Sequence, residues 1–204
     1  MKLSDPDSLP PRLRRKIAYR NLAVGERLFR RGDTAESFFI VDKGRISLSR
    51  PTIENKTAVL QFAKLGDIIG ENAIFEATYT HSAIAINDSR VIVYPKNFIT
   101  EILRTHPELI ADLLTFMHHK ITYFQNNLEL REIRAAHQRV LQFLIYAADA
   151  KQAVKLDLSL HNVARQLGFA PATLSRALLK LETDGSITRE RESNVIYLNR
   201  STAA

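Results

Sequence analysis

Polar and basic side chains that can contact nucleic acid are concentrated between residues 165 and 180 of the 204-residue chain. An arginine can bond to both acceptors of a guanine in the major groove, and a serine or threonine can bond to a phosphate or a base edge. Basic side chains nearby add salt-dependent attraction to phosphates. We therefore predict base and phosphate recognition here, with Arg176 on a guanine. The residues expected to face DNA are Arg165, Ala172, Thr173, Ser175, Arg176 and Lys180.

Two helices joined by a tight turn must position these residues. Within residues 160–181, Ala164 is small enough for two steeply crossing helices to approach, and Gly168 suits a turn with positive φ. Pro171 suits the first turn of the second helix. Residues 187–190 and 195–198 then predict a β-hairpin. The segment is typical of a winged helix-turn-helix, and the alternative is a helical hairpin without DNA function. The expected buried contacts are Val163, Leu167, Leu174, Leu178 and Leu181.

A β-rich unit precedes this region. Short apolar segments separated by glycine, aspartate and asparagine turns are typical of an all-β sandwich or barrel. The expected strands are residues 27–29, 37–41, 45–49, 58–62, 82–86 and 91–94. A short helix at 96–104 should follow, and Pro107 suits the start of a long one.

The long helix carries apolar residues at alternating intervals of four and three, which is a heptad seam. We predict that this seam is a homodimer interface, and the alternative is one amphipathic helix buried within its own chain. A second stripe of Leu113, Phe116, Tyr123 and Leu130 lies beside it. A further helix is expected at 138–148, followed by a linker-like stretch at 149–155. The seam residues are Ile110, Leu114, Met117, Ile121, Phe124 and Leu128.

The chain resembles the cyclic-AMP receptor protein and fumarate-nitrate-reduction regulator (CRP/FNR) family of bacterial transcription factors. The resemblance implies an α+β fold with an N-terminal β-roll, like the cyclic-nucleotide-binding jelly roll, in residues 1–106. A dimerisation helix in 107–136 and a winged helix-turn-helix in 137–204 complete it. It also implies a homodimer on a pseudo-palindromic operator in double-stranded DNA, with RNA polymerase as a further partner. The matching positions are 25–26, 28–29, 31–33, 35–36, 38–41, Gly44, the phosphate-binding cassette at 65–75, 163–164, Gly168 and 173–176.

The same resemblance places an effector pocket in the β-roll and the long helix. Relatives that bind cyclic nucleotides use an arginine where this chain has His81, and a largely neutral histidine is a poor counter-charge for a cyclic phosphate. We therefore do not expect cyclic AMP, and predict no cofactor; another small ligand, or none, stays open. Haem would need His81, His118 or His119 as an axial ligand. The pocket positions are Gly70, Glu71, His81, Ser82, Phe124 and Gln125.

The recognition helix departs from the family pattern at two positions. Relatives carry a glutamate where this chain has Ala172, and cyclic-AMP receptor proteins carry an arginine where it has Pro171. Loss of the carboxylate removes an acceptor for cytosine. The operator should therefore be relaxed or different at that base pair.

Composition limits the remaining choices. The chain has 29 lysines and arginines, 22 aspartates and glutamates, a net charge of +7 and no cysteine, which excludes thiolate metal sites and iron–sulfur sensing through cysteine. Residues 1–31 alone carry nine basic and three acidic side chains. No membrane segment or catalytic constellation is apparent, so we expect a cytoplasmic DNA-binding protein and not an enzyme. The alternative is a cyclic-nucleotide-binding-like signalling module that does not bind DNA.

Overall fold

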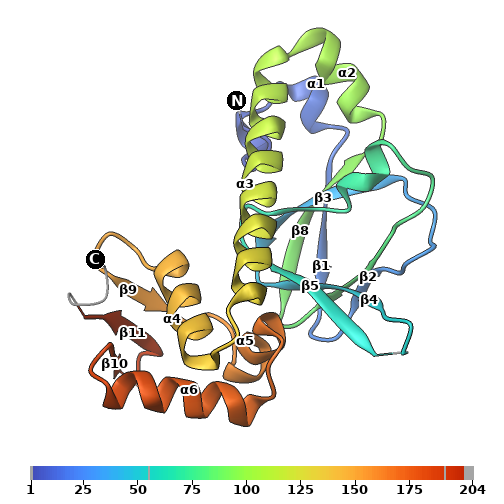
Figure 1. Ribbon diagram of the computed structural model, residues 1–204. Coiled ribbons are helices and arrows are strands. Elements are labelled where there is room, and N and C mark those ends of the chain that lie inside the picture. Colours follow the sequence, from blue (N-terminus) through green and yellow to red (C-terminus); the bar gives the residue numbers. More distant parts are fainter. Residues whose placement is uncertain (1, 55, 191, 200–204) are drawn as a thin grey trace. The chain divides into compact units, whose positions relative to one another are not determined.

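The computed structural model describes residues 2–54, 56–190 and 192–199. The chain forms two compact units, Met1–Lys120 and Ile121–Ala204, and the long helix α3 (Pro107–Glu132) contributes residues to both (Figure 1).

The first unit contains two antiparallel sheets of four strands each, ordered β1-β8-β3-β6 and β2-β7-β4-β5. The six predicted strands are present, so the β-roll expectation is confirmed. The strands β1 and β6 were not predicted, and β6 is only two residues long. The bounds are β1 Ala18–Leu22, β2 Arg27–Phe29, β3 Ser37–Lys43, β4 Ile46–Pro51, β5 Thr57–Ala63, β6 Ile68–Ile69, β7 Ser82–Ala85 and β8 Ser89–Pro95.

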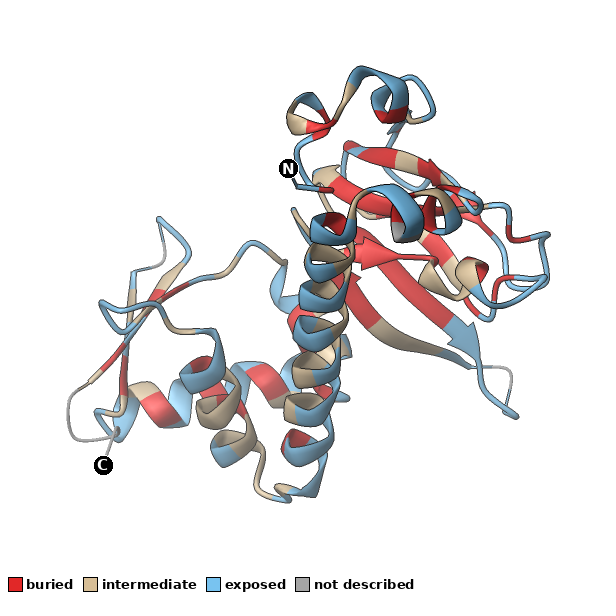
Figure 2. Cartoon of the chain, turned by 90° about the horizontal axis from the view of Figure 1, so that it is seen from above, coloured by how far each residue is buried: buried red, intermediate tan, exposed pale blue. Residues whose placement is uncertain are grey.

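Strand β3 is buried on both faces, which explains its unbroken apolar run. Because successive side chains of a strand point to opposite faces, Phe39 and Val41 join the core between the two sheets, whereas Phe38 and Ile40 join a second cluster. That second cluster includes Phe98 and Ile102 of helix α2 (Phe98–Thr105). Figure 2 shows buried residues, in red, along the strands of the first unit.

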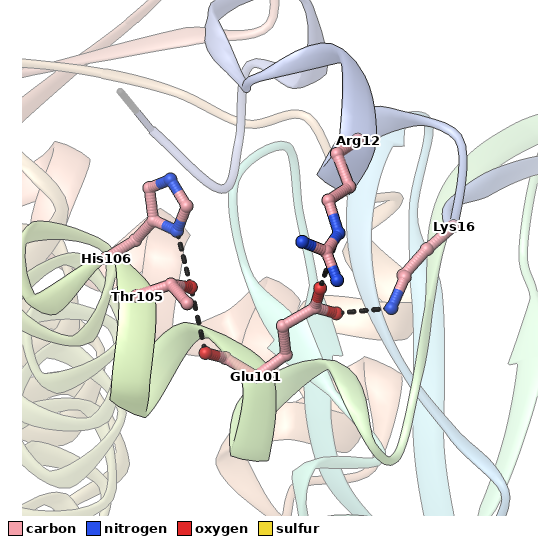
Figure 3. Close-up of polar contacts among 5 residues, drawn as sticks. All are labelled: Arg12, Lys16, Glu101, Thr105 and His106. Carbon is pink, nitrogen blue, oxygen red and sulfur yellow. Dashed lines mark hydrogen bonds and ion pairs between the residues drawn. The ribbon is translucent and has the colours of Figure 1, made fainter.

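The basic N-terminal segment packs onto this second cluster. It contains the short helices η1 (Pro6–Ser8) and α1 (Pro11–Arg14), and Leu3, Leu9 and Leu13 are buried. The Leu3 N–H donates to the Asp112 carboxylate at 2.5 Å. Arg12 and Lys16 lie 3.6 and 2.5 Å from the Glu101 carboxylate on α2 (Figure 3). The segment is therefore a structural part of the first unit.

The core of the second unit is formed by the end of α3, three further helices and a three-stranded sheet ordered β10-β11-β9. The predicted linker at 149–155 was partly wrong, because Ala153–Lys155 form strand β9. Val154 of this strand is buried. In the turn before it, the Asp149 carboxylate accepts hydrogen bonds from the N–H groups of Lys151 and Ala153. The other bounds are α4 Ala136–Ala147, α5 Leu160–Leu167, α6 Pro171–Thr183, β10 Ile187–Glu190 and β11 Val195–Leu198.

Candidate nucleic-acid interface

Helices α5 and α6 form the predicted helix-turn-helix. The Ser159 hydroxyl caps α5 by accepting from the Asn162 N–H at 3.3 Å, and Gly168 ends α5 at φ 72°, a left-handed conformation that glycine adopts without strain. Pro171 begins α6. Ala164 is fully buried in the shared core. The local signals in the sequence therefore set both helix ends and the turn.

The exposed side of α6 carries most of the residues expected to face DNA. Ala172, Ser175, Arg176 and Lys180 are exposed, as is Arg165 on α5. Thr173 differs because it is only half-exposed: it lies four residues before the buried Ala177 and so shares its side of the helix.

These side chains make local contacts in the protein alone. The Ser175 hydroxyl donates to the Pro171 carbonyl at 3.1 Å, and Arg176 Nε donates to the Ala172 carbonyl at 3.4 Å. Lys180 pairs with Asp184 at 3.1 Å. Contacts of this exposed kind are weak, so these side chains can leave them for another partner at little cost.

A two-stranded wing follows α6, as predicted. Strands β10 and β11 pair from Ile187 with Leu198 to Glu190 with Val195. Ile187, Ile196 and Leu198 face the core of the second unit. Because β11 also pairs with β9, the wing is the edge of a sheet.

Arg139 of α4 supports the turn, and sequence reasoning missed it. Its guanidinium donates to the carbonyls of Leu167 at 3.2 Å and Ile133 at 2.9 Å, and lies 4.7 Å from the ring centroid of Phe169. A cation is favourable beside the free carbonyls at a helix C-terminus. No local pattern marks this arginine.

The β-roll positions expected to form an effector pocket have partners within the first unit. Glu71 Oε1 lies 2.5 Å from Lys120 Nζ, and Ser82 Oγ accepts from the Arg31 N–H at 3.0 Å. Gly70 has φ 68°, and a Cβ there would lie 3.1 Å from the Tyr79 ring. Phe124 and Gln125 are exposed on α3.

His81, at the position of the family's arginine, is almost fully buried. Its Nδ1 lies 3.2 Å from Thr80 Oγ1, and its ring meets Phe29 edge-on at 5.6 Å between centroids. Burial lowers the pKa of His81, while nearby Glu71 acts in the opposite direction. The imidazole is therefore neutral at pH 7 and supplies no counter-charge for a phosphate.

The two adjacent histidines of α3, His118 and His119, are exposed. Within the part of the chain that the structure describes, no three metal-ligating side chains are grouped closely enough to hold a metal ion. No described helix has both the length and the apolar character that crossing a membrane requires.

The fold and this surface define a class of two-domain protein, with a cyclic-nucleotide-type β-roll joined to a winged helix-turn-helix. Residues 19–106 match the family description of a cyclic nucleotide-binding domain, and residues 138–202 match that of a Crp-like helix-turn-helix domain. The chain belongs to the CRP/FNR family and is a DNA-binding transcriptional regulator. The signalling module without DNA binding is not favoured, because the matched helix-turn-helix belongs to regulators.

Relatives support this assignment over most of the chain. The transcriptional activator protein Anr of Pseudomonas aeruginosa is 26% identical over 197 residues, which cover 93% of this chain and 80% of the relative. The nitrogen fixation regulation protein FixK of Bradyrhizobium diazoefficiens is 26% identical over 174 residues, covering 82% and 73%. The solved structure of FixK2 from Bradyrhizobium japonicum has the same fold, with a TM-score of 0.75, 20% identity and coverage of 91% and 94%.

Proposed function

We propose that this regulator binds a pseudo-palindromic operator as a homodimer and reads each half-site with α6. The observation that carries the proposal is the exposed Arg176, presented on a helix whose opposite side is fixed by Leu174, Ala177 and Leu178 in the core. A guanine is the base that an arginine recognises with two hydrogen bonds.

The dimer is supported by the solvent exposure of the heptad seam on α3. Leu114, Ile121, Phe124 and Leu128 are between 42 and 65% exposed, although a soluble helix normally buries its apolar stripe. Ile110 and Met117 are partly buried against the second cluster of the first unit, the one that includes Phe38 and Ile40. We assign the exposed seam positions to a second copy of this chain.

Cyclic AMP is not expected to control binding. The neutral, buried His81 lacks the permanent charge and the donor fork of an arginine. The likeness to relatives named as transcriptional activators supports RNA polymerase as a further partner, and DNA as the target supports a cytoplasmic location. No catalytic role is proposed.

Selection of DNA fragments from random sequence by the purified protein tests this function. We expect an enriched palindrome whose half-site centres lie about 10 bp apart, or a multiple of that spacing. Added cyclic AMP should change neither the sequence nor the affinity. Failure to enrich any sequence above the starting pool would contradict DNA reading, and enrichment of isolated half-sites would contradict the dimer.

A further inference from the structure

An ion pair joins the cassette segment to the long helix. Lys120 Nζ of α3 lies 2.5 Å from Glu71 Oε1 in the short helix η2 (Glu71–Ile74) and donates to the Ile68 carbonyl at 3.3 Å. The side chains are only 11% and 21% exposed for Lys120 and Glu71. Each charge has therefore lost much of its hydration, and each depends on the other for compensation.

The backbone that carries Glu71 is fixed by the aromatic core. Gly70, the residue before it, is left-handed, and a Cβ at Gly70 would approach the rings of Tyr79, Phe29 and Phe39 to within 3.1–3.3 Å. The Tyr79 and Phe29 rings are stacked with centroids 3.9 Å apart. Glu71 is thus presented from a rigid position, and Lys120 reaches it from α3.

Two buried polar atoms near the pair, Glu71 Oε2 and His81 Nε2, have no hydrogen-bond partner among the described residues. An anionic ligand would have to draw Lys120 away from Glu71 and would then face the carboxylate. A free cation would compete with an ammonium that is tethered to the same chain and has a high effective concentration.

We propose that Lys120 is a built-in ligand of the cassette: the chain itself supplies the ammonium that Glu71 binds. The first unit then holds its structure without a small effector, and operator binding needs none. The statement about operator binding rests on the proposed function, whereas the statement about the structure of the first unit concerns the β-roll alone. The cassette carboxylate of Glu71 should therefore bind a primary ammonium and not a cyclic phosphate.

Chemical rescue tests this assignment. Lys120→Ala removes three methylenes and the ammonium, and should lower the thermal midpoint by roughly 5 °C or more, since it leaves a partly buried carboxylate unpaired. Propylammonium chloride has the atoms that were removed and should restore a large part of the loss. Propanol and an equal concentration of sodium chloride should not. Equal effects of propanol and propylammonium would overturn the proposal.

Two further variants separate charge from packing. The double variant Glu71→Gln with Lys120→Ala should show no specific rescue, because the anionic acceptor is gone. Lys56→Ala removes a lysine from the exposed pair with Glu54 and should leave the midpoint unchanged. If Lys120→Ala does not fold, Glu71→Gln alone still tests the pair: it should lower the midpoint, and an unchanged value would overturn the proposal.

Wild-type protein provides the functional readout. Its midpoint and its operator affinity should not respond to propylammonium or to cyclic nucleotides, and extraction of the purified protein should release no bound small molecule. Operator binding that requires such a molecule would contradict the built-in ligand. The thermal midpoint is measured without DNA. If the protein never bound DNA, that result would contradict the proposed function, but the rescue of the midpoint would still test the built-in ligand.

Discussion

The guanidinium of Arg139 lies over the ring of Phe169, 4.7 Å from its centroid, and donates to the Leu167 carbonyl at the end of α5. One side chain of α4 thus contacts both the last carbonyl of α5, that of Leu167, and Phe169, the residue that follows the turn glycine. The start of α6 is set by this contact together with the shared core.

Replacement of Arg139 should loosen the turn. We expect Arg139→Ala to lower the free energy of unfolding by about 2 kcal/mol, because it removes charged hydrogen bonds and a cation–π contact, and to weaken operator binding. Chemical denaturation and DNA titration measure the two effects. Arg134→Ala removes an exposed positive charge from the preceding loop and is the matched control. Equal behaviour of the two variants would show that only charge matters.

The assignment of Arg176 to a base predicts a loss of specificity. Arg176→Ala should cost about 1–3 kcal/mol in operator binding and relax the preference at one base pair in each half-site. Arg165→Ala should weaken binding to all sequences and reduce the salt dependence. Repeated selection with each variant measures both properties. An unchanged sequence preference of Arg176→Ala would refute the assignment.

The seam predicts that a charge on α3 breaks the dimer. Leu128→Glu places carboxylates of two copies in an apolar interface and should give monomers in sedimentation, with operator affinity lost in parallel. The monomer fold should survive, because Leu128 is 65% exposed. His118→Glu adds the same charge at an exposed position outside the seam and should remain dimeric. A dimeric Leu128→Glu protein would place the interface elsewhere.

Burial of His81 predicts that stability falls with acid. Its pKa is lowered chiefly by loss of hydration; Glu71 raises it, and Lys120 and Arg50 lower it further. The unfolded state therefore binds a proton at His81 more readily than the folded state does. The stability that the neutral His81 contributes is present above the unfolded pKa of about 6.5 and is lost as the pH falls below it. The loss can reach about 1.4 kcal/mol per pH unit.

His81→Gln should flatten the dependence of unfolding free energy on pH between 7.5 and 5, a window set by that pKa of about 6.5. His119→Gln, at an exposed histidine of α3, is the control and should keep the wild-type slope. Identical slopes for both variants and the wild type would mean that His81 titrates normally in the folded protein.

The N-terminal segment should matter through its leucines. Leu13 is 1% exposed, and Leu13→Ala should cost about 2–5 kcal/mol of stability by leaving a cavity. Arg12 lies on the surface, so Arg12→Ala should cost less than about 1 kcal/mol. Denaturant titration compares the two, and a small effect of Leu13→Ala would mean that the segment does not pack in solution.

Local patterns determined much of this protein from its sequence. Gly168 marks the C-terminal end of α5 because glycine adopts positive φ without strain, and Pro171 marks the start of α6 because its fixed φ suits a first helical turn. The heptad spacing on α3 and the alternation in β10 and β11 follow from the periods of a helix and a strand. These signals need no knowledge of what lies across the fold.

The tertiary structure decided which side chains meet. Leu3 and Asp112, Glu71 and Lys120, and Arg139 and Leu167 are 109, 49 and 28 residues apart. A lysine on a helix has the same local pattern whether water or a carboxylate surrounds its ammonium. The N-terminal segment, with nine basic side chains in residues 1–31, also supplies the buried Leu3, Leu9 and Leu13. Only the packing of distant elements shows this role.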